Sequence, residues 1–223
     1  MRKAVWTLNI DDYAPELCAL TYPLLQRYAS RIGADFNVIT KRKFPEWPVV
    51  YEKLQIYELG RAYEWSIFFD SDCLVHPELF DITELLPRDT VLQHSKDFAP
   101  NRFDYDDYFR RDGRHIGACN WFTVASNWCL DLWKPLDDLT LGDAVARIHP
   151  VVIEKRVGIP SAHLIDDFVL SRNIARFGLK HKMFEQWLVE LGRPADEYFW
   201  HCYTLPEEQK LTVMKDVLTR WRI

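Results

Sequence analysis

The sequence predicts an α/β fold, a mostly parallel, doubly wound sheet flanked by helices. Apolar segments of strand length at 4–10, 35–40 and 65–69 are separated by two segments whose apolar side chains recur at helical spacing. This alternation of strand and helix is typical of a parallel sheet. A chain of 223 residues, 48% of them hydrophobic, can bury one sizeable core, and we see no linker or repeat in it. We therefore expect residues 1–223 to form a single domain.

The first strand and the first helix follow from the N-terminal residues. Residues 4–10 are an apolar run that ends in polar side chains. Asp12 is the expected N-cap of the helix that follows, and Pro15 suits its first turn. Apolar side chains then recur at helical spacing as far as Gly33, which is expected to end the helix.

The next elements lead to the most apolar strand of the chain. Residues 35–40 are a short second strand, and a loop rich in Pro and Trp at 43–48 precedes a helix that carries Lys53. The segment WSIFF at 65–69 is a continuous rather than an alternating apolar run. A strand that is covered on both faces requires this pattern, so we expect helices on both faces of the sheet.

The second half of the chain is less regular. Residues 101–115 contain four Asp and four Arg but few apolar side chains, which predicts a loop that is mobile without ligand and closes over a bound one. For the remainder we expect strands at 91–95, 119–126 and 179–185, helices at 128–133, 141–157 and 161–177, and an amphipathic helix at the C-terminus.

Composition excludes several classes of protein. The net charge of −5, from 28 basic and 33 acidic side chains, provides no basic footprint for nucleic acid or anionic lipid. Five cysteines without a Cys-x-x-Cys pair disfavour a disulfide scaffold and a structural zinc site. Asp11 precedes any secretory apolar region and no stretch of about 18 apolar residues occurs, so we expect a cytoplasmic protein without a transmembrane segment. The absence of a Gly-rich phosphate loop excludes kinases and P-loop enzymes.

Two Asp-x-Asp pairs are present, and their surroundings distinguish them. With 20 Asp among 223 residues, chance predicts about two such pairs. Asp104 and Asp106 lie in the charged 101–115 stretch and are expected to be solvated surface charge. Asp70 and Asp72 directly follow the most apolar strand, at the edge where ligands bind in open α/β sheets.

The chemistry of Asp70 and Asp72 points to a divalent cation. Residues i and i+2 of an extended segment face the same side, so both carboxylates can contact one ion. Carboxylate oxygens suit Mg²⁺ or Mn²⁺, which in turn bind diphosphates. The alternative is a turn at the end of the strand in which Asp side chains cap loop amides, which explains one Asp better than two.

The segment WSIFFDSDCLVHPE resembles the metal-binding segment of glycosyltransferases that have the single-domain, Rossmann-like GT-A fold. The order of the other motifs is similar to that of the glycogenin-like and galactomannan-galactosyltransferase-like families. The resemblance covers residues 4–204. It implies a GT-A sheet with an irregular second half on the acceptor side, and a Mn²⁺ or Mg²⁺ cofactor.

The same resemblance implies roles for further residues. Lys53 would contact a phosphate or the sugar of the donor, and Asn120 in GACNWFTVAS would lie near the sugar. Asp166 and Asp167 begin a helix, where anionic carboxylates are stabilised, and would act on the acceptor hydroxyl. His201 in FWHCYT would complete the metal shell. An exposed helix lysine, helix-capping carboxylates and a buried core histidine are the structural alternatives. The remaining donor contacts are expected from Thr7, Asn9, Asp11 and Ser71.

These predictions describe a metal-dependent glycosyltransferase that moves a hexose from a nucleotide diphosphate sugar, expected to be a UDP-sugar, to the hydroxyl of a glycan or another acceptor. The resemblance implies retention of anomeric configuration, whereas an inverting enzyme would use Asp166 or Asp167 as its base. One alternative is a nucleotidyltransferase that makes the nucleotide sugar, which the lack of a Gly-rich signature after the first strand disfavours. Another is a non-catalytic carbohydrate-binding protein, with which nine Trp are compatible.

Overall fold

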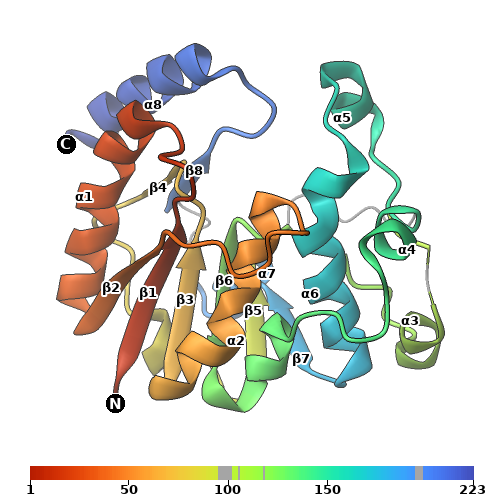
Figure 1. Cartoon of the computed structure of the whole chain (residues 1–223). Helices are drawn as coiled ribbons and strands as arrows, with labels where there is room; N and C mark the ends of the chain where they lie inside the picture. The colour runs from red at the N-terminus through yellow and green to blue at the C-terminus, as the bar shows by residue number, and fades with distance from the viewer. Residues whose placement is uncertain (95–101, 105, 118, 194–197) are drawn as a thin grey trace.

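A computed structural model describes residues 1–94, 102–104, 106–117, 119–193 and 198–223. Within these residues six strands form one sheet in the order β2-β1-β3-β6-β5-β7, with helices packed around it (Figure 1). The strands of this sheet are β1 (Lys3–Leu8), β2 (Ala34–Ile39), β3 (Trp65–Phe69), β5 (Thr90–Gln93), β6 (Phe122–Ser126) and β7 (Lys180–Met183).

The sheet is mostly parallel, as the sequence predicted. Strand β1 pairs in parallel with β2 and β3, and β5 pairs in parallel with β7. Strand β6 runs antiparallel to both of its neighbours, β3 and β5. Every residue of β1 and β3 is buried, which is the double coverage that the apolar run at 65–69 predicts. The predicted fold class is therefore confirmed.

Helices cover both faces of this sheet. Side chains alternate along each strand, so Trp6 and Phe68 pack in the core beneath α6, while Val5 and Ile67 pack in the core beneath α1 and α7. A smaller core lies between α1 and α8. The helices are α1 (Pro15–Arg31), α2 (Ile56–Leu59), α3 (Asp107–Asp112), α4 (Leu141–Val145), α5 (Val152–Val157), α6 (Ile165–Arg176), α7 (Phe184–Glu190) and α8 (Glu207–Trp221).

A second, two-stranded sheet lies just past the end of β3. It pairs β4 (Cys73–Val75) with β8 (Phe199–His201) in antiparallel orientation. The register sets Cys73 opposite His201. Strand pairing thus brings a histidine from the C-terminal region next to the Asp-x-Asp segment, although the two are far apart in the sequence.

The start of α1 differs from the prediction. Pro15 lies in the first turn of the helix, and Gly33 with a φ of 67° follows its end, as expected. Its N-cap is Ala14 rather than Asp12, and no side chain caps it. The chain takes positive φ values at Asp11, Asp12 and Ala14, so the helix begins only after this left-handed stretch.

Two later elements also differ from the prediction. The helix expected over 141–157 is divided into α4 and α5, with Pro150 between them. The strand expected over 179–185 ends at Met183, and the chain continues into α7, whose apolar side chains Phe184 and Trp187 are buried. Of the strand expected over 91–95, Ser95 lies outside the described residues.

The charged 101–115 stretch contains a short helix and buried aromatic side chains, which the sequence did not predict. Asp106 caps the short helix α3 by accepting hydrogen bonds from the first backbone N–H groups of the helix. Phe103 and Phe109 are both buried in the core beside α6. The expectation of a loop throughout is therefore wrong for the described part, where Asp107–Asp112 form a helix and two aromatic side chains pack in the core. Asn101 and Tyr105 lie outside the described residues.

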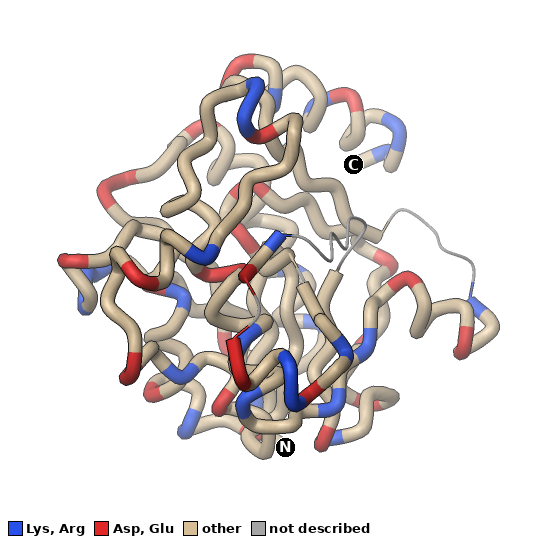
Figure 2. Tube along the Cα trace, turned by 90° about the vertical axis from the view of Figure 1, so that its right-hand side faces the viewer, with Lys and Arg blue, Asp and Glu red and all other residues tan. Residues whose placement is uncertain are grey.

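Basic and acidic residues are mixed along the chain. Lys and Arg positions lie among Asp and Glu positions along the trace in Figure 2. Some of these neighbours form exposed ion pairs, such as Arg2 with Asp35 at 3.1 Å, and each such pair contributes about 0–1 kcal/mol of stability. Among the described residues no helix is both long and apolar enough to cross a bilayer.

Candidate active site

A cavity of about 1090 Å³ lies at the ends of β1 and β3. Ligands bind at this edge of open α/β sheets. The cavity is lined by the segments that follow the two strands, by the start of α6 and by the segment from β8 to α8. Its ionisable lining residues include Asp11, Lys53, Asp70, Asp72, Asp166, Asp167 and His201.

The Asp-x-Asp turn is held in place through its middle residue. Ser71 is buried, and its hydroxyl donates a hydrogen bond to the carbonyl oxygen of Leu8 at the end of β1. Thr21 of α1 donates to the carbonyl oxygen of Ser71 at 2.6 Å, and the hydroxyl of Thr7 lies 3.3 Å from that of Ser71. These bonds fix the turn between β1 and α1, so that the carboxylates on either side of Ser71 have defined positions.

Asp70, Asp72 and His201 meet at one end of the cavity. One ligand atom from each of the three lies within 4.8 Å of the others. The Nε2 atom of His201 is 3.2 Å from Asp72 Oδ1 and 4.0 Å from Asp70 Oδ2. The imidazole stacks on Trp121, with ring centroids 5.0 Å apart and planes inclined by 16°. Two carboxylates and one imidazole are a donor set that suits Mn²⁺, so these residues fit a divalent cation.

The surroundings shift the pKa values of the two carboxyls in opposite directions. Burial raises the pKa of Asp70, and Lys53 offsets that effect only in part. Burial also acts to raise the pKa of Asp72, but His201 and Lys210 lower it by more, so its pKa falls well below the usual range. Asp72 is therefore the more firmly ionised of the two residues.

Lys53 links the Asp-x-Asp turn to helix α6. Its ammonium group is 2.8 Å from Asp70 Oδ1 and 2.6 Å from Asp166 Oδ2, and the residue is only 4% exposed. Burial acts to lower the pKa of Lys53, but Asp166 and Asp70 raise it by more. The alternative of an exposed helix lysine is thus wrong: Lys53 lies in a 3₁₀ helix (Val49–Gln55) and is a buried, doubly paired cation on the cavity wall.

Asp167 lies beside Asp166 in a different environment. Its Oδ1 accepts a hydrogen bond of 2.8 Å from the backbone N–H of Asn120. Burial and the charge of Asp166 raise the pKa of Asp167 to about 8, against the lowering effect of Arg102. Asp166 is therefore paired with Lys53, whereas Asp167 is a buried carboxyl with a raised pKa.

Negative charge exceeds positive charge around the turn. Lys210 of α8 forms an ion pair with Asp72, and the Tyr13 hydroxyl lies 3.5 Å from the same carboxylate. Two ammonium groups, of Lys53 and Lys210, thus face four carboxyl groups. A divalent cation would offset this excess, and the raised pKa of Asp167 relieves part of it without an ion.

The remaining predicted residues lie in two kinds of position. Asp11 lines the cavity, in the left-handed stretch before α1. Thr7 and Asn9 support the site from beneath: Thr7 is completely buried under Ser71, and the Asn9 amide donates to the Cys18 sulfur at 3.9 Å. Sequence reasoning missed the lining residues Arg102, Trp121, Tyr203 and Lys210. Lys210 could have been noticed as a lysine in the first turn of an amphipathic helix, but nothing in the sequence singles out the others.

Comparison with known proteins identifies the fold. No protein-family profile matches the sequence, and no curated protein matches it. Among solved structures the chain resembles a glycosyltransferase involved in the glycosylation of the major capsid of PBCV-1, with a TM-score of 0.57 and 12% identity over 97% of this chain and 100% of that one. Galactosyltransferase LgtC, solved in complex with donor and acceptor sugar analogues, aligns with a TM-score of 0.48 and 14% identity over 98% of this chain and 99% of that one.

The PBCV-1 likeness spans nearly the whole of both chains and is to a glycosyltransferase. It shows that the mixed, mostly parallel sheet with its flanking helices has the fold of GT-A glycosyltransferases. At this level of identity the likeness concerns the fold, so the activity has to be argued from the site itself.

Proposed function

We propose that the protein is a divalent-metal-dependent hexosyltransferase that moves a hexose from a nucleotide diphosphate sugar, a UDP-hexose, to the hydroxyl of a glycan or another acceptor. The observation that carries this proposal is the convergence of Asp70, Asp72 and His201 at the ligand-binding edge of a GT-A sheet. The cavity beside them has a volume of about 1090 Å³, ample for a nucleotide sugar.

The leaving diphosphate needs its charge neutralised. Asp70, Asp72 and His201 would hold the cation, Mn²⁺ rather than Mg²⁺ because an imidazole is a softer donor than a carboxylate or water. A divalent cation bound there supplies Lewis-acid stabilisation of the diphosphate as the bond to the sugar breaks. The turn that carries the carboxylates is fixed through Ser71, so these ligands need little reorganisation on binding.

The other wall of the cavity would orient the sugar and the acceptor. Lys53 holds Asp70 and Asp166 at 2.8 and 2.6 Å, and so sets the distance between the metal side and the α6 side of the site. Its positive charge would also favour a developing negative charge nearby. Asn120 and Asp167 would contact the sugar, Asp11 and Ser71 would line the nucleotide side of the pocket, and Thr7 and Asn9 would support that side from beneath.

We assign a retaining outcome, in line with the likeness of the motifs to the glycogenin-like and galactomannan-galactosyltransferase-like families. The ion pair with Lys53, at 2.6 Å, engages the Asp166 carboxylate and makes this residue a poor candidate for the base. Asp167 is then the residue that an inverting reaction would have to use as base. The anomeric configuration of the product, read by NMR, separates the two outcomes.

A thermal-shift screen tests the proposed activity most directly. A ligand that binds only the folded protein raises its melting temperature. We expect UDP-glucose or UDP-galactose to raise it with Mn²⁺ and to do so much less without metal, and the same mixture to release UDP slowly by hydrolysis. Stabilisation by a free glycan without metal would indicate a carbohydrate-binding protein instead. Formation of a nucleotide sugar from a nucleoside triphosphate and a sugar phosphate would indicate a nucleotidyltransferase.

A further inference from the structure

Two buried donor groups on the cavity wall lack hydrogen-bond partners among the described residues. They are Nε of Arg102 and Nδ2 of Asn120, on residues that are 5% and 2% exposed. Buried polar groups in folded proteins are nearly always hydrogen-bonded, and exceptions call for a specific explanation. Both residues line the same cavity, which makes a bound ligand a natural partner for them.

Arg102 and Asn120 both act on Asp167. The backbone N–H of Asn120 donates to the Asp167 carboxyl at 2.8 Å. Burial acts to lower the pKa of Arg102, but the charges of Asp167 and Glu154 raise it by more, so Asp167 is an electrostatic neighbour of the guanidinium. The two residues that carry the unpartnered donors are therefore both neighbours of the same carboxyl at the start of α6.

Glu154 fixes the position of Arg102. Its Oε1 accepts hydrogen bonds from Arg102 Nη2 and, at 2.7 Å, from the hydroxyl of Tyr203. Its Oε2 accepts from the backbone N–H of Val151 at 2.9 Å, at the start of α5. Glu154 is itself fully buried. The guanidinium is thus held in one orientation by a carboxylate that is anchored at both oxygens.

Both cations on this wall are paired with carboxylates. Arg102 pairs with Glu154, and Lys53 lies between Asp166 and Asp70. Among the residues that the structure describes, this wall presents hydrogen-bonding groups but no unpaired cation. It matches a neutral, hydroxyl-rich ring better than an anionic sugar or a phosphate.

We propose that Arg102 is a specificity-determining residue that hydrogen-bonds hydroxyl groups of the transferred sugar, alongside Asn120, and that Glu154 is its positioning residue. This inference rests on the proposed function, because it takes the cavity to be the donor site. It adds that the sugar, and not the nucleotide or the diphosphate, is the part of the donor that Arg102 recognises.

Titration calorimetry in the presence of Mn²⁺ separates these parts of the donor. The probes are UDP alone and whichever of UDP-glucose and UDP-galactose binds the wild-type protein more tightly. Arg102→Lys keeps the charge but loses the planar fork. We expect its affinity for UDP to stay within about twofold of wild type, and its affinity for the UDP-sugar to fall about tenfold, the loss typical of a hydrogen bond to a charged group.

Arg172→Lys is the matched control. Arg172 is also a buried arginine paired with carboxylates, but it does not line the cavity. Its replacement should leave the affinities for UDP and for the UDP-sugar unchanged, whatever it does to the melting temperature.

A second pair of variants covers the case in which Arg102→Lys fails to fold. The double variant Arg102→Gln with Glu154→Gln removes both charges and leaves neither buried and unpaired. It should show the same selective loss for the UDP-sugar. Glu154→Gln alone, whose carbonyl oxygen can still accept from Arg102 and Tyr203 although its NH2 cannot accept from Val151, should retain more of the sugar-dependent affinity than Glu154→Ala.

Three results would overturn the inference. One is a Lys variant that binds the UDP-sugar as tightly as wild type, and another is an equal loss for UDP and the UDP-sugar, which would place Arg102 at the nucleotide or in the scaffold. The third is wild-type protein that binds neither probe with Mn²⁺. That result, seen before any variant is made, would refute the proposed function itself.

Discussion

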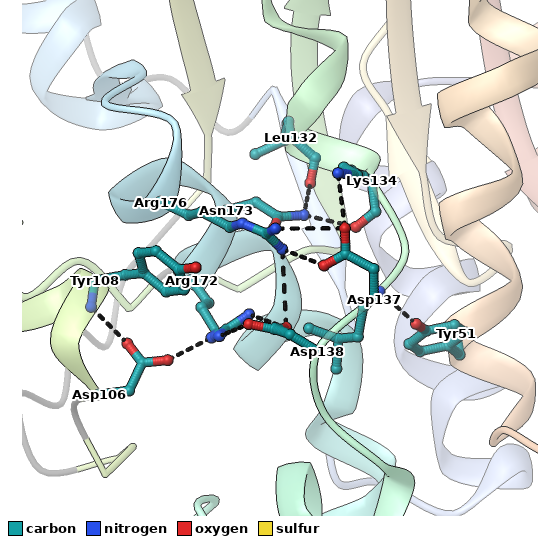
Figure 3. Close-up of polar contacts among 11 residues, drawn as sticks. Tyr51, Asp106, Tyr108, Leu132, Lys134, Asp137, Asp138, Arg172, Asn173 and Arg176 are labelled. Carbon is teal, nitrogen blue, oxygen red and sulfur yellow. Dashed lines mark hydrogen bonds and ion pairs between the residues drawn. The ribbon is translucent and has the colours of Figure 1, made fainter.

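The two ends of helix α6 hold charged groups in different ways. Its first turn carries Asp166 and Asp167, which line the cavity. Its last two turns carry Arg172 and Arg176, which point toward carboxylates from two other segments (Figure 3). One helix thus contributes to two polar clusters. They differ in whether their charged groups are already paired within the protein, and that difference indicates which cluster binds a ligand.

The cluster at the end of α6 is complete without a ligand. Arg172 contacts Asp106 at 2.5 Å and Asp138 at 2.6 Å, and Arg176 contacts Asp137 at 2.6 Å. Lys134 also pairs with Asp137, so three cations meet three carboxylates. This arrangement ties α3 and the 134–138 segment to α6. Asp106 is therefore a structural residue, and the expectation that it is solvated surface charge is wrong.

The cluster at the start of α6 is incomplete. The lysines beside the Asp-x-Asp turn are fewer than the carboxyl groups, one carboxyl has a pKa raised to about 8, and two buried donors on the wall lack partners among the described residues. A folded protein retains such unfavourable features mainly where a ligand relieves them. The cluster with equal numbers of cations and carboxylates therefore belongs to the scaffold of this molecule, and the cluster with an excess of carboxyl groups belongs to the candidate site.

The largest effect is expected from Asp72→Asn, which removes a charge from the unbalanced cluster while keeping the size of the side chain. Transfer or donor hydrolysis with Mn²⁺ should fall about 10²–10³-fold in kcat/KM, as for loss of a strong transition-state contact. Circular dichroism should show an unchanged fold.

Asp104→Asn is the control for that variant. Asp104 belongs to the other Asp-x-Asp pair, is 61% exposed and contacts His149 at 2.8 Å. Its replacement should leave activity within about twofold of wild type, since exposed ion pairs contribute about 0–1 kcal/mol. Near-wild-type turnover of Asp72→Asn would show that Asp70 and Asp72 do not form a metal site.

A substitution in the balanced cluster, at the end of α6, should lower the stability of the protein rather than its activity. Arg172→Met keeps the aliphatic stem but leaves Asp106 and Asp138 without their main partner. We expect the free energy of unfolding to fall by about 3 kcal/mol, because removal of one partner of a buried pair leaves an uncompensated charge. Activity per folded molecule should stay within about twofold. A urea denaturation curve beside an activity assay measures both, and a large loss of activity in the folded fraction would contradict the scaffold role.

The sheet could be predicted from the sequence because short runs of neighbouring residues indicate its strands and the helices between them. The apolar run at 65–69, the start of α1 at Pro15 and its end at Gly33 each depend on a few neighbouring residues. Asp70, Asp72 and the pair at the start of α6 could be found for the same reason. The family resemblance supplied Lys53 and His201, whose positions relative to the turn depend on contacts between distant segments.

The missed features have in common that they depend on packing. Asp106 looked like surface charge because its partner Arg172 lies 66 residues further along the chain. Arg102 lay in a stretch dominated by charge, and only the fold shows that Glu154 holds it. The first two residues of helix α7 were taken for the end of a strand, since a helix of 7 residues is too short to show a clear helical period.

His201→Ala should have an intermediate effect on the unbalanced cluster. It removes the one nitrogen ligand of the candidate metal group and the ring that stacks on Trp121. We expect the affinity for Mn²⁺ in the presence of UDP to fall about tenfold, the lower end of the range for losses at a metal site. Calorimetric titration of Mn²⁺ measures it.

The control for that variant is His181→Ala, in β7. Burial and Arg114 lower the pKa of His181 to about 4, so this histidine is neutral, as a metal-binding histidine would be. It should lower stability without changing the affinity for Mn²⁺. A destabilised His201→Ala protein with normal Mn²⁺ affinity would instead identify His201 as a packing residue.

The last effect concerns the pH dependence of stability, and it tests whether negative charge at the start of α6 is energetically unfavourable. The pKa of Asp167 is about 8 in the folded protein and about 3.9 in an unfolded chain. Between these values the folded state retains a proton that the unfolded state has lost. The resulting stabilisation is complete below about pH 4 and is lost progressively as the pH rises to about 8.

Asp167→Asn replaces the carboxyl with a neutral group of the same shape, so its stability should lack this dependence. Metal-free wild-type protein should lose about 1.4 kcal/mol per pH unit relative to the variant between pH 5 and pH 7, which is about 3–6 °C in melting temperature per pH unit for a chain of this size. Calorimetric melting of both proteins at pH 5, 6, 7 and 8 measures the difference. Parallel curves would mean that Asp167 is ionised in the folded protein throughout this pH range. The negative charge at the start of α6 would then be no more unfavourable than that of the paired carboxylates in the arginine cluster at the other end.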